Sequence, residues 1–178
     1  NVGLRCKVGA AVRMENEKLI PRQNRRSMGR LSIFAVQAAE QAVKDSGIKT
    51  EQLTGGKLGC AIGSTMGSAE SLAEAFEIMA ADKDISNLSS TKFFQCVSHT
   101  AAMNTAQYLG ITGYVLAPSA ACASSLQAIG AGFDLIRLGK QDIMLCGGAE
   151  GLHPTVVGSF DVLYATSSNY NKEPKKTP

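Results

Sequence analysis

The stretch APSAACASSLQAIGAG, residues 117–132, places a cysteine where an apolar segment gives way to a run of small residues. The segment YVLAPS at 114–119 predicts a buried strand, and the residues from Cys122 to Leu138 predict a long helix that Gly139 ends. Cys122 therefore lies at the carboxyl end of a strand, where open α/β sheets place their sites. It also lies at a helix N-terminus, whose unpaired N–H groups favour an anion such as a thiolate.

Small side chains surround this cysteine and continue along the predicted helix, which carries both Gly130 and Gly132. A glycine inside a helix costs about 1 kcal/mol relative to alanine, so we expect close packing to offset it and the helix to be buried. Two interpretations of Cys122 stay open at this point. It is either a nucleophile whose oxyanion the helix N–H groups stabilise, or a small core residue at a crowded crossing.

The same strand-to-helix alternation extends along the chain. Short apolar runs that enter glycines predict buried strands at 57–63 and 141–148. Helical periodicity predicts three further helices, at 27–46, 68–81 and 98–109. Strands that alternate with helices indicate parallel βαβ units, so the predicted fold class is α/β. We expect residues 1–26 to be irregular and the polar tail 169–178 to be an exposed loop.

The composition excludes several classes of protein. The 178 residues are 19% charged and 44% hydrophobic, which is typical of a soluble globular domain. A net charge of +3 is too small to indicate a nucleic-acid partner, and no apolar run approaches the roughly 20 residues that span a membrane. The five cysteines form no CxxC pair, which disfavours zinc and a disulfide framework and favours the reducing cytoplasm. GSTMGS at 63–68 lacks the lysine of a phosphate-binding loop.

Several motifs, taken in order, resemble one family. PSAACASSLQAIGAGFDLIRLGKQDIMLCGGAE at 118–150 resembles the nucleophile region of the β-ketoacyl-acyl carrier protein synthases, which are condensing enzymes of the thiolase-like fold. GCAIGSTMGS at 59–68 resembles the strand and turn beside the acyl pocket of that family. FFQCVSHTAAMNTAQYLGITG at 93–113 resembles its dimer-interface segment, and GSFDVLYATSS at 158–168 contains a phenylalanine that the family places near the nucleophile. The similarity near LGKQDIM and SSNYNKEP favours the elongating members.

The resemblance implies a fold, an activity and partners. Residues 1–178 would be most of the N-terminal half of a thiolase-like layered condensing-enzyme domain, with its first strand and C-terminal half outside this sequence. Cys122 would accept an acyl group from an acyl carrier protein and condense it with malonyl carrier protein, with loss of carbon dioxide. The family works in the cytoplasm as a homodimer in fatty acid or polyketide synthesis. The resemblance implies no cofactor, no metal, no nucleic acid and no membrane partner.

The resemblance also assigns roles around the acyl pocket. Met66 matches the turn residue that lines the fatty-acyl pocket, and Phe160 matches the phenylalanine beside the nucleophile. Phe94 and Cys96 match positions that reach into the pocket of the partner subunit. For Met66 and Phe160, ordinary packing is the alternative interpretation.

Two further pairs of residues complete the comparison with the family. Arg22 and Arg26 fall where some members present basic residues to the acidic carrier protein, although a solvated basic loop is the alternative. The family also needs two histidines that bind the malonyl thioester. His99 and His153 lie outside the matching motifs, so we expect both to be structural or surface residues and the catalytic histidines to lie outside residues 1–178.

Two other functions remain as alternatives. One is a non-catalytic partner subunit, similar to the chain-length factors that pair with active synthases, but those subunits usually lack the cysteine. The other is a thiolase, which shares the fold and the thiol and uses coenzyme A. The GGAE segment at 147–150 and the residues after it favour the synthases.

Overall fold

The computed structural model describes residues 3–13 and 16–177 of the chain, which divides into two compact units. The larger unit comprises residues 15–151, and the smaller unit comprises residues 1–14 and 152–178. Within the described ranges, the longest apolar helices are too short to traverse a lipid bilayer.

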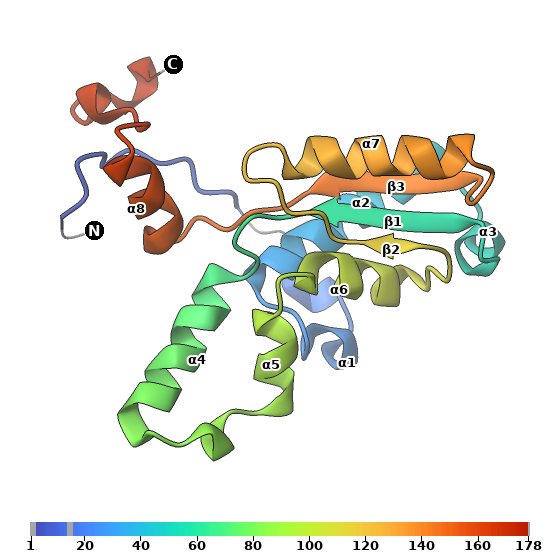
Figure 1. Ribbon diagram of the computed structural model, residues 1–178, viewed down its shortest axis with the longest axis horizontal. Helices are drawn as coiled ribbons and strands as arrows, with labels where there is room; N and C mark the ends of the chain where they lie inside the picture. The colour runs from blue at the N-terminus through green and yellow to red at the C-terminus, as the bar shows by residue number, and fades with distance from the viewer. Residues whose placement is uncertain (1–2, 14–15, 178) are drawn as a thin grey trace. The chain divides into compact units, whose positions relative to one another are not determined.

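A three-stranded parallel sheet forms the centre of the larger unit (Figure 1). The strands run in the order β2-β1-β3 and comprise β1 (Leu58–Gly63), β2 (Val115–Leu116) and β3 (Ile143–Gly148). Strand β1 pairs with β3 over its whole length, from Leu58 opposite Ile143 to Gly63 opposite Gly148. The prediction of an α/β fold with parallel strands is confirmed. The strand predicted at 114–119 is shorter than expected, because Pro118 has no N–H to donate to a ladder.

Helices cover both faces of this sheet (Figure 1). Helices α2 (Arg30–Ser46) and α6 (Thr100–Leu109) pack on one face, and α7 (Ser124–Arg137) packs on the other. A buried hydrophobic cluster lies between β1 and the pair α2–α6; its members are Leu31, Ala35, Leu53, Leu58, Cys60, Ile62, Ala101, Ala102, Ala106 and Ile111. Helix α2 ends where predicted, at Gly47, whose left-handed φ of 71° few other residues adopt easily.

The remaining elements of the larger unit are mostly short. They are η1 (Glu17–Leu19), α1 (Arg22–Arg25), α3 (Thr50–Thr54), α4 (Ala69–Asp82), η2 (Ile85–Asn87) and α5 (Ser90–Cys96). Of these, the sequence predicted only α4. The prediction that residues 1–26 are irregular is wrong at 17–19 and 22–25. Elements of one or two turns span too few residues for a hydrophobic period to show in the sequence.

The smaller unit is held together by side chains from its C-terminal segment. It contains α8 (Pro154–Val162), η3 (Ser168–Tyr170) and η4 (Pro174–Lys176). The buried carboxylate of Asp161 accepts the backbone N–H groups of Arg5, at 2.8 Å, and Cys6, at 3.1 Å, and also the hydroxyl of Thr166. Asn171 donates to the carbonyl of Arg5 at 2.7 Å. The tail expected to be a loop thus contains two 3-10 turns and part of this hydrogen-bond network.

Candidate functional site

Cys122 lies in the short connection between β2 and α7, directly before the residue that caps the helix. Its thiol is free and its side chain is exposed. The preceding residue, Ala121, has a φ of 49°, in the left-handed region that non-glycine residues rarely occupy. Such strain persists only where surrounding contacts hold it, and it is common at functional sites. The chain therefore turns sharply immediately before the thiol.

The buried side chain of Ser124 holds this turn. Its hydroxyl accepts the backbone N–H of Ala120 at 2.8 Å and donates to the carbonyl of Ala121 at 2.7 Å. The Ala123 N–H also donates to the Ala120 carbonyl at 3.0 Å. These two hydrogen bonds of the Ser124 hydroxyl stabilise the strained backbone at Ala121. From the sequence, Ser124 has no role of its own, although it is one of the small residues that surround Cys122.

Small residues in α7 and in the strands allow the helix to pack closely against the sheet, as predicted from the sequence. A Cβ at Gly63 would overlap the carbonyl group of Ser124, and a Cβ at Gly148 would lie 2.6 Å from the Cβ of Ser125. A Cβ at Gly132 would overlap the sulfur of Cys146. Glycine at these three positions therefore allows the helix and the strands to approach backbone to backbone.

The expectation that α7 is buried on all sides is wrong for this chain. Ala128 is fully buried against the sheet, but a Cβ at Gly130 would meet no atom within 4 Å. The large apolar side chains on the outer face are exposed; they are Leu126 (68%), Ile129 (52%), Phe133 (58%) and Ile136 (43%). The described residues cover one side of this helix and leave a continuous apolar face on the other.

The turn after β1 carries Met66, whose side chain is 40% exposed. Glu150, two residues beyond β3, reaches this turn. Its carboxylate accepts the backbone N–H of Thr65 at 2.8 Å and that of Met66 at 3.4 Å, and the Ser64 hydroxyl at 3.4 Å. The sequence indicated Met66 but gave no role to Glu150, because a contact between residues 84 positions apart leaves no trace in local spacing.

The structure places Phe94 and Cys96 together on α5. Phe94 is 44% exposed and packs edge to face against Phe93, with ring centroids 5.6 Å apart. The half-buried thiol of Cys96 contacts the carbonyl oxygen of Ser71 at 3.3 Å, and burial raises its pKa. In β1, burial raises the pKa of Cys60 to about 12. A raised pKa leaves less of the thiolate, which is the reactive form, near neutral pH.

Arg22 and Arg26 are exposed at the two ends of α1. Arg25 between them is engaged differently, because its guanidinium donates to the carbonyl of Ile20 at 3.0 Å and contacts Glu17 at 3.3 Å. The structure thus separates one structural arginine from two exposed ones. Whether the exposed pair binds a partner stays a prediction.

The other predicted residues lie at helix ends or in the smaller unit. His99 is exposed and precedes α6, and His153 precedes α8, where its Nδ1 accepts the N–H of Thr155 at 3.3 Å. Phe160 lies on α8 and is 40% exposed. Its role beside the nucleophile stays a prediction. Within residues 3–13 and 16–177, no three His, Cys, Asp or Glu side chains gather in a way that could hold a metal ion.

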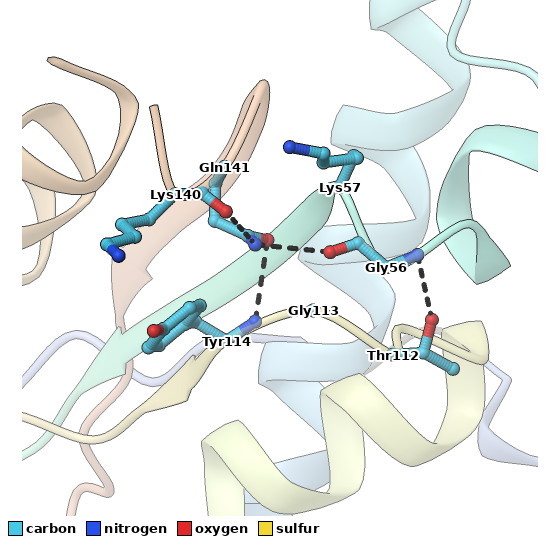
Figure 2. Close-up of a pocket in the computed structure, with 7 residues that line it drawn as sticks. All are labelled: Gly56, Lys57, Thr112, Gly113, Tyr114, Lys140 and Gln141. Carbon is cyan, nitrogen blue, oxygen red and sulfur yellow. Dashed lines mark hydrogen bonds between the residues drawn. The ribbon is translucent and has the colours of Figure 1, made fainter. Parts of the chain in front are cut away.

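A cavity of about 450 Å³ opens at the opposite edge of the sheet, before the amino ends of the strands (Figure 2). Figure 2 shows the buried Gln141 side chain extending between Gly56, Lys140 and Tyr114. Its amide donates to the carbonyls of Gly56, at 3.1 Å, and Lys140, at 2.6 Å, and accepts the N–H of Tyr114 at 3.4 Å. The amide of Gln141 thus connects the segments that precede the three strands. The cavity lies at the end of the sheet opposite Cys122.

Comparisons with known proteins give consistent findings. The family described as "Beta-ketoacyl synthase, N-terminal domain" matches residues 13–177. The chain is 28% identical over 175 residues to 3-oxoacyl-acyl-carrier-protein synthase 1 of Haemophilus influenzae, covering 98% of this chain and 43% of that protein. The crystal structure of a β-ketoacyl synthase from Burkholderia phymatum is similar with a TM-score of 0.87 and 38% identity, again covering 98% of this chain and 43% of the other.

A further solved structure contains a type II polyketide synthase acyl-carrier protein in complex with its ketosynthase bound to the hexaketide. It is similar with a TM-score of 0.69 and 31% identity, and the match covers 78% of this chain and 35% of that one. The chain thus spans less than half the length of the relatives that it matches.

Proposed function

The chain belongs to the β-ketoacyl synthase family, and from that premise we propose that it carries the nucleophile of a 3-oxoacyl-acyl carrier protein synthase. The observation that carries the proposal is the position of Cys122. Its thiol is exposed at the N-terminus of α7, beyond the strained residue Ala121, whose conformation Ser124 holds. A cysteine that served only in core packing would be buried, and it would not require a strained residue directly before it.

The first proposed step is acyl transfer. The Cys122 sulfur forms a bond to the carbonyl carbon of an acyl thioester on an acyl carrier protein, and the carrier-protein sulfur leaves with its electron pair. The backbone N–H of Cys122, with a second donor elsewhere in the full-length protein, stabilises the tetrahedral oxyanion. Sulfur suits this role because it is both a good nucleophile and a good leaving group.

The second proposed step is decarboxylating condensation. Malonyl carrier protein loses carbon dioxide, and the electron pair of the broken carbon–carbon bond attacks the acyl carbon held on Cys122. The cysteine leaves as a thiolate, and the product is a 3-oxoacyl carrier protein. Since neither His99 nor His153 lies in a matching motif, we assign the histidines of this step to the part of the protein beyond these residues.

The rest of the protein also accounts for the exposed face of α7. The relatives are more than twice as long as this chain, and Leu126, Ile129 and Phe133 are between 52% and 68% exposed on one face of the helix, which is typical of an interaction surface. We propose that the C-terminal half of the condensing-enzyme domain covers this face. Met66, Phe94, Cys96 and Phe160 would line acyl pockets in a homodimer.

Intact mass after brief incubation with cerulenin, an inhibitor that alkylates this type of nucleophile, tests the proposal on the full-length protein. We expect one adduct in the native protein and in Cys146→Ala, and none in Cys122→Ala. Cys146→Ala is the matched control, because it removes a thiol in β3 whose pKa burial raises and which has no role in the proposed site. A folded native protein that forms no adduct would have an inert Cys122 and would favour a non-catalytic partner subunit instead.

A further inference from the structure

Glu150 and the turn that carries Met66 come from different strands and are joined by hydrogen bonds. The turn begins at Ser64, directly after β1, and Glu150 follows β3. The Glu150 carboxylate accepts the N–H groups of Thr65 and Met66 and the hydroxyl of Ser64. Successive N–H groups that point to one place form a concavity suited to an anion, and here a side chain of the same chain provides that anion.

The segment that precedes Cys122 also contacts this turn. The N–H of Ser64 donates to the carbonyl of Pro118 at 3.2 Å, four residues before Cys122. Gly63, which precedes the turn, lies against the backbone of Ser124. The backbone of Met66 is thus connected on one side to Glu150 and on the other to the segment that positions Cys122.

A shift of the turn away from Glu150 and from the Pro118 segment would break these hydrogen bonds. The Ser64 hydroxyl also accepts the N–H of Gly67 at 3.1 Å, so both ends of the turn depend on the same group of contacts. The bond from the Thr65 N–H, at 2.8 Å, has the short length typical of a charge-assisted hydrogen bond, whereas those from Met66 and Ser64 are longer, at 3.4 Å.

We propose that Glu150 is a positioning residue that sets acyl chain-length selectivity, because it fixes the backbone of Met66 relative to Cys122. The inference rests on the proposed function, in which Met66 lines the acyl pocket. Glu150 would not touch the reacting atoms. Without its carboxylate, only the contacts of Ser64 hold the turn, so the Met66 side chain can move aside and the pocket accepts longer chains.

The test is the rate of acyl transfer to Cys122 of the full-length protein from saturated acyl thioesters of increasing chain length. Glu150→Gln keeps the size but removes the charge and one of the two acceptor oxygens, and we expect the kcat/KM ratio of long to short donors to rise about tenfold. Rates with the shortest donors should change least, because short chains do not reach Met66. Glu77→Gln is the matched control, because it removes the same charge from an exposed position on α4.

Two further measurements separate positioning from a general loss of stability. In a Met66→Ala background, Glu150→Gln should no longer change the selectivity, because the residue through which it acts is gone. Hydrogen exchange should show faster exchange of the Thr65 and Met66 amides in Glu150→Gln than in the native protein.

The outcomes distinguish this inference from the proposed function. An equal change at every chain length, an unchanged profile, or an effect that persists with Met66→Ala overturns the positioning role while leaving acylation of Cys122 intact. Absence of acylation by every donor in the native protein overturns both.

Discussion

Gly63 at the end of β1 lies directly against Ser124, the first residue of α7, so that a Cβ at position 63 would overlap the Ser124 carbonyl group. This contact connects the central strand with the turn that presents Cys122. Because Ser124 also holds the strained Ala121, a displacement at residue 63 is transmitted to the thiol through two contacts.

Gly63→Ala should therefore reduce both stability and acylation. Inserting a methyl group into such a close contact forces the helix start to shift, and we expect a loss of about 1–3 kcal/mol in the free energy of unfolding. The rate of acyl transfer to Cys122 should fall together with it. Chemical denaturation and acyl loading of the full-length protein measure the two effects. Gly151→Ala, where a Cβ meets no described atom within 4 Å, is the control and should be nearly neutral.

Charge reversal at Arg22 and Arg26 should weaken the encounter with an acidic carrier protein. We expect Arg22→Glu with Arg26→Glu to raise the KM for a carrier-protein substrate roughly tenfold and to reduce its salt dependence, because exposed charges act mainly on association. The rate with a small acyl thioester should not change. Lys44→Glu, at the C-terminal end of α2, makes the same kind of charge change elsewhere. An equal loss with both substrates would contradict a docking role.

Phe133→Ala tests whether the outer face of α7 is covered in the full-length protein. If the remainder of the chain packs on this face, removing the ring should cost about 3–5 kcal/mol in unfolding free energy. Leu19→Ala is the control, because Leu19 is 71% exposed in η1 and should stay within about 0.5 kcal/mol. A Phe133 variant as neutral as the Leu19 variant would show that the face is open to solvent.

Gln141→Met should destabilise the protein without altering the chemistry. The substitution keeps an unbranched side chain of similar length but leaves the Tyr114 N–H and the Gly56 carbonyl without their partner. Both groups are part-buried, and the loss of a hydrogen bond of this kind costs about 0.5–1.5 kcal/mol. Thermal unfolding should show this loss, whereas acylation of Cys122 at the opposite edge of the sheet should proceed normally below the unfolding temperature. Gln107→Met, at an exposed position of α6, is the control.

Asp161 should make the smaller unit sensitive to acid. The N–H of Arg5, together with the hydroxyl of Thr166 and the N–H of Cys6, lowers the pKa of this carboxyl below its usual value of 3.8. A folded-state pKa below the unfolded value means that the carboxylate adds stability above the unfolded pKa, and that this stability is lost as the pH falls through the folded one.

Asp161→Asn should accordingly lower the unfolding midpoint at neutral pH, and the difference from the native protein should shrink as the pH falls below about 4. Thermal unfolding of both proteins from neutral pH to below about pH 4 measures this difference in midpoint. Asp45→Asn, at an exposed position near the end of α2, should show no such convergence. A difference that does not depend on pH would mean that the carboxylate charge is irrelevant to this network.

Much of the site could be predicted because its signals are local. Gly47 and Gly110 end α2 and α6 with left-handed backbone, as glycines after periodic segments predict. Cys122 follows an apolar strand and precedes a helix rich in small residues, so its place at the sheet edge could be inferred from spacing alone. Glu150, Ser124 and Gln141 could not be found in this way, because each acts through hydrogen bonds whose partners depend on how the backbone turns.

By itself, the sequence determined the alternation of strands and helices, the parallel sheet and the place of the cysteine at a strand-to-helix junction. These follow from hydrophobic periodicity and from glycine, which act over neighbouring residues. Only the tertiary structure decided that Ala121 is strained, that Glu150 reaches the Met66 turn, and that one face of α7 stays uncovered. The physical reason is that hydrogen bonds and close contacts between distant segments form only when the sheet aligns its strand ends, and no local pattern encodes that alignment.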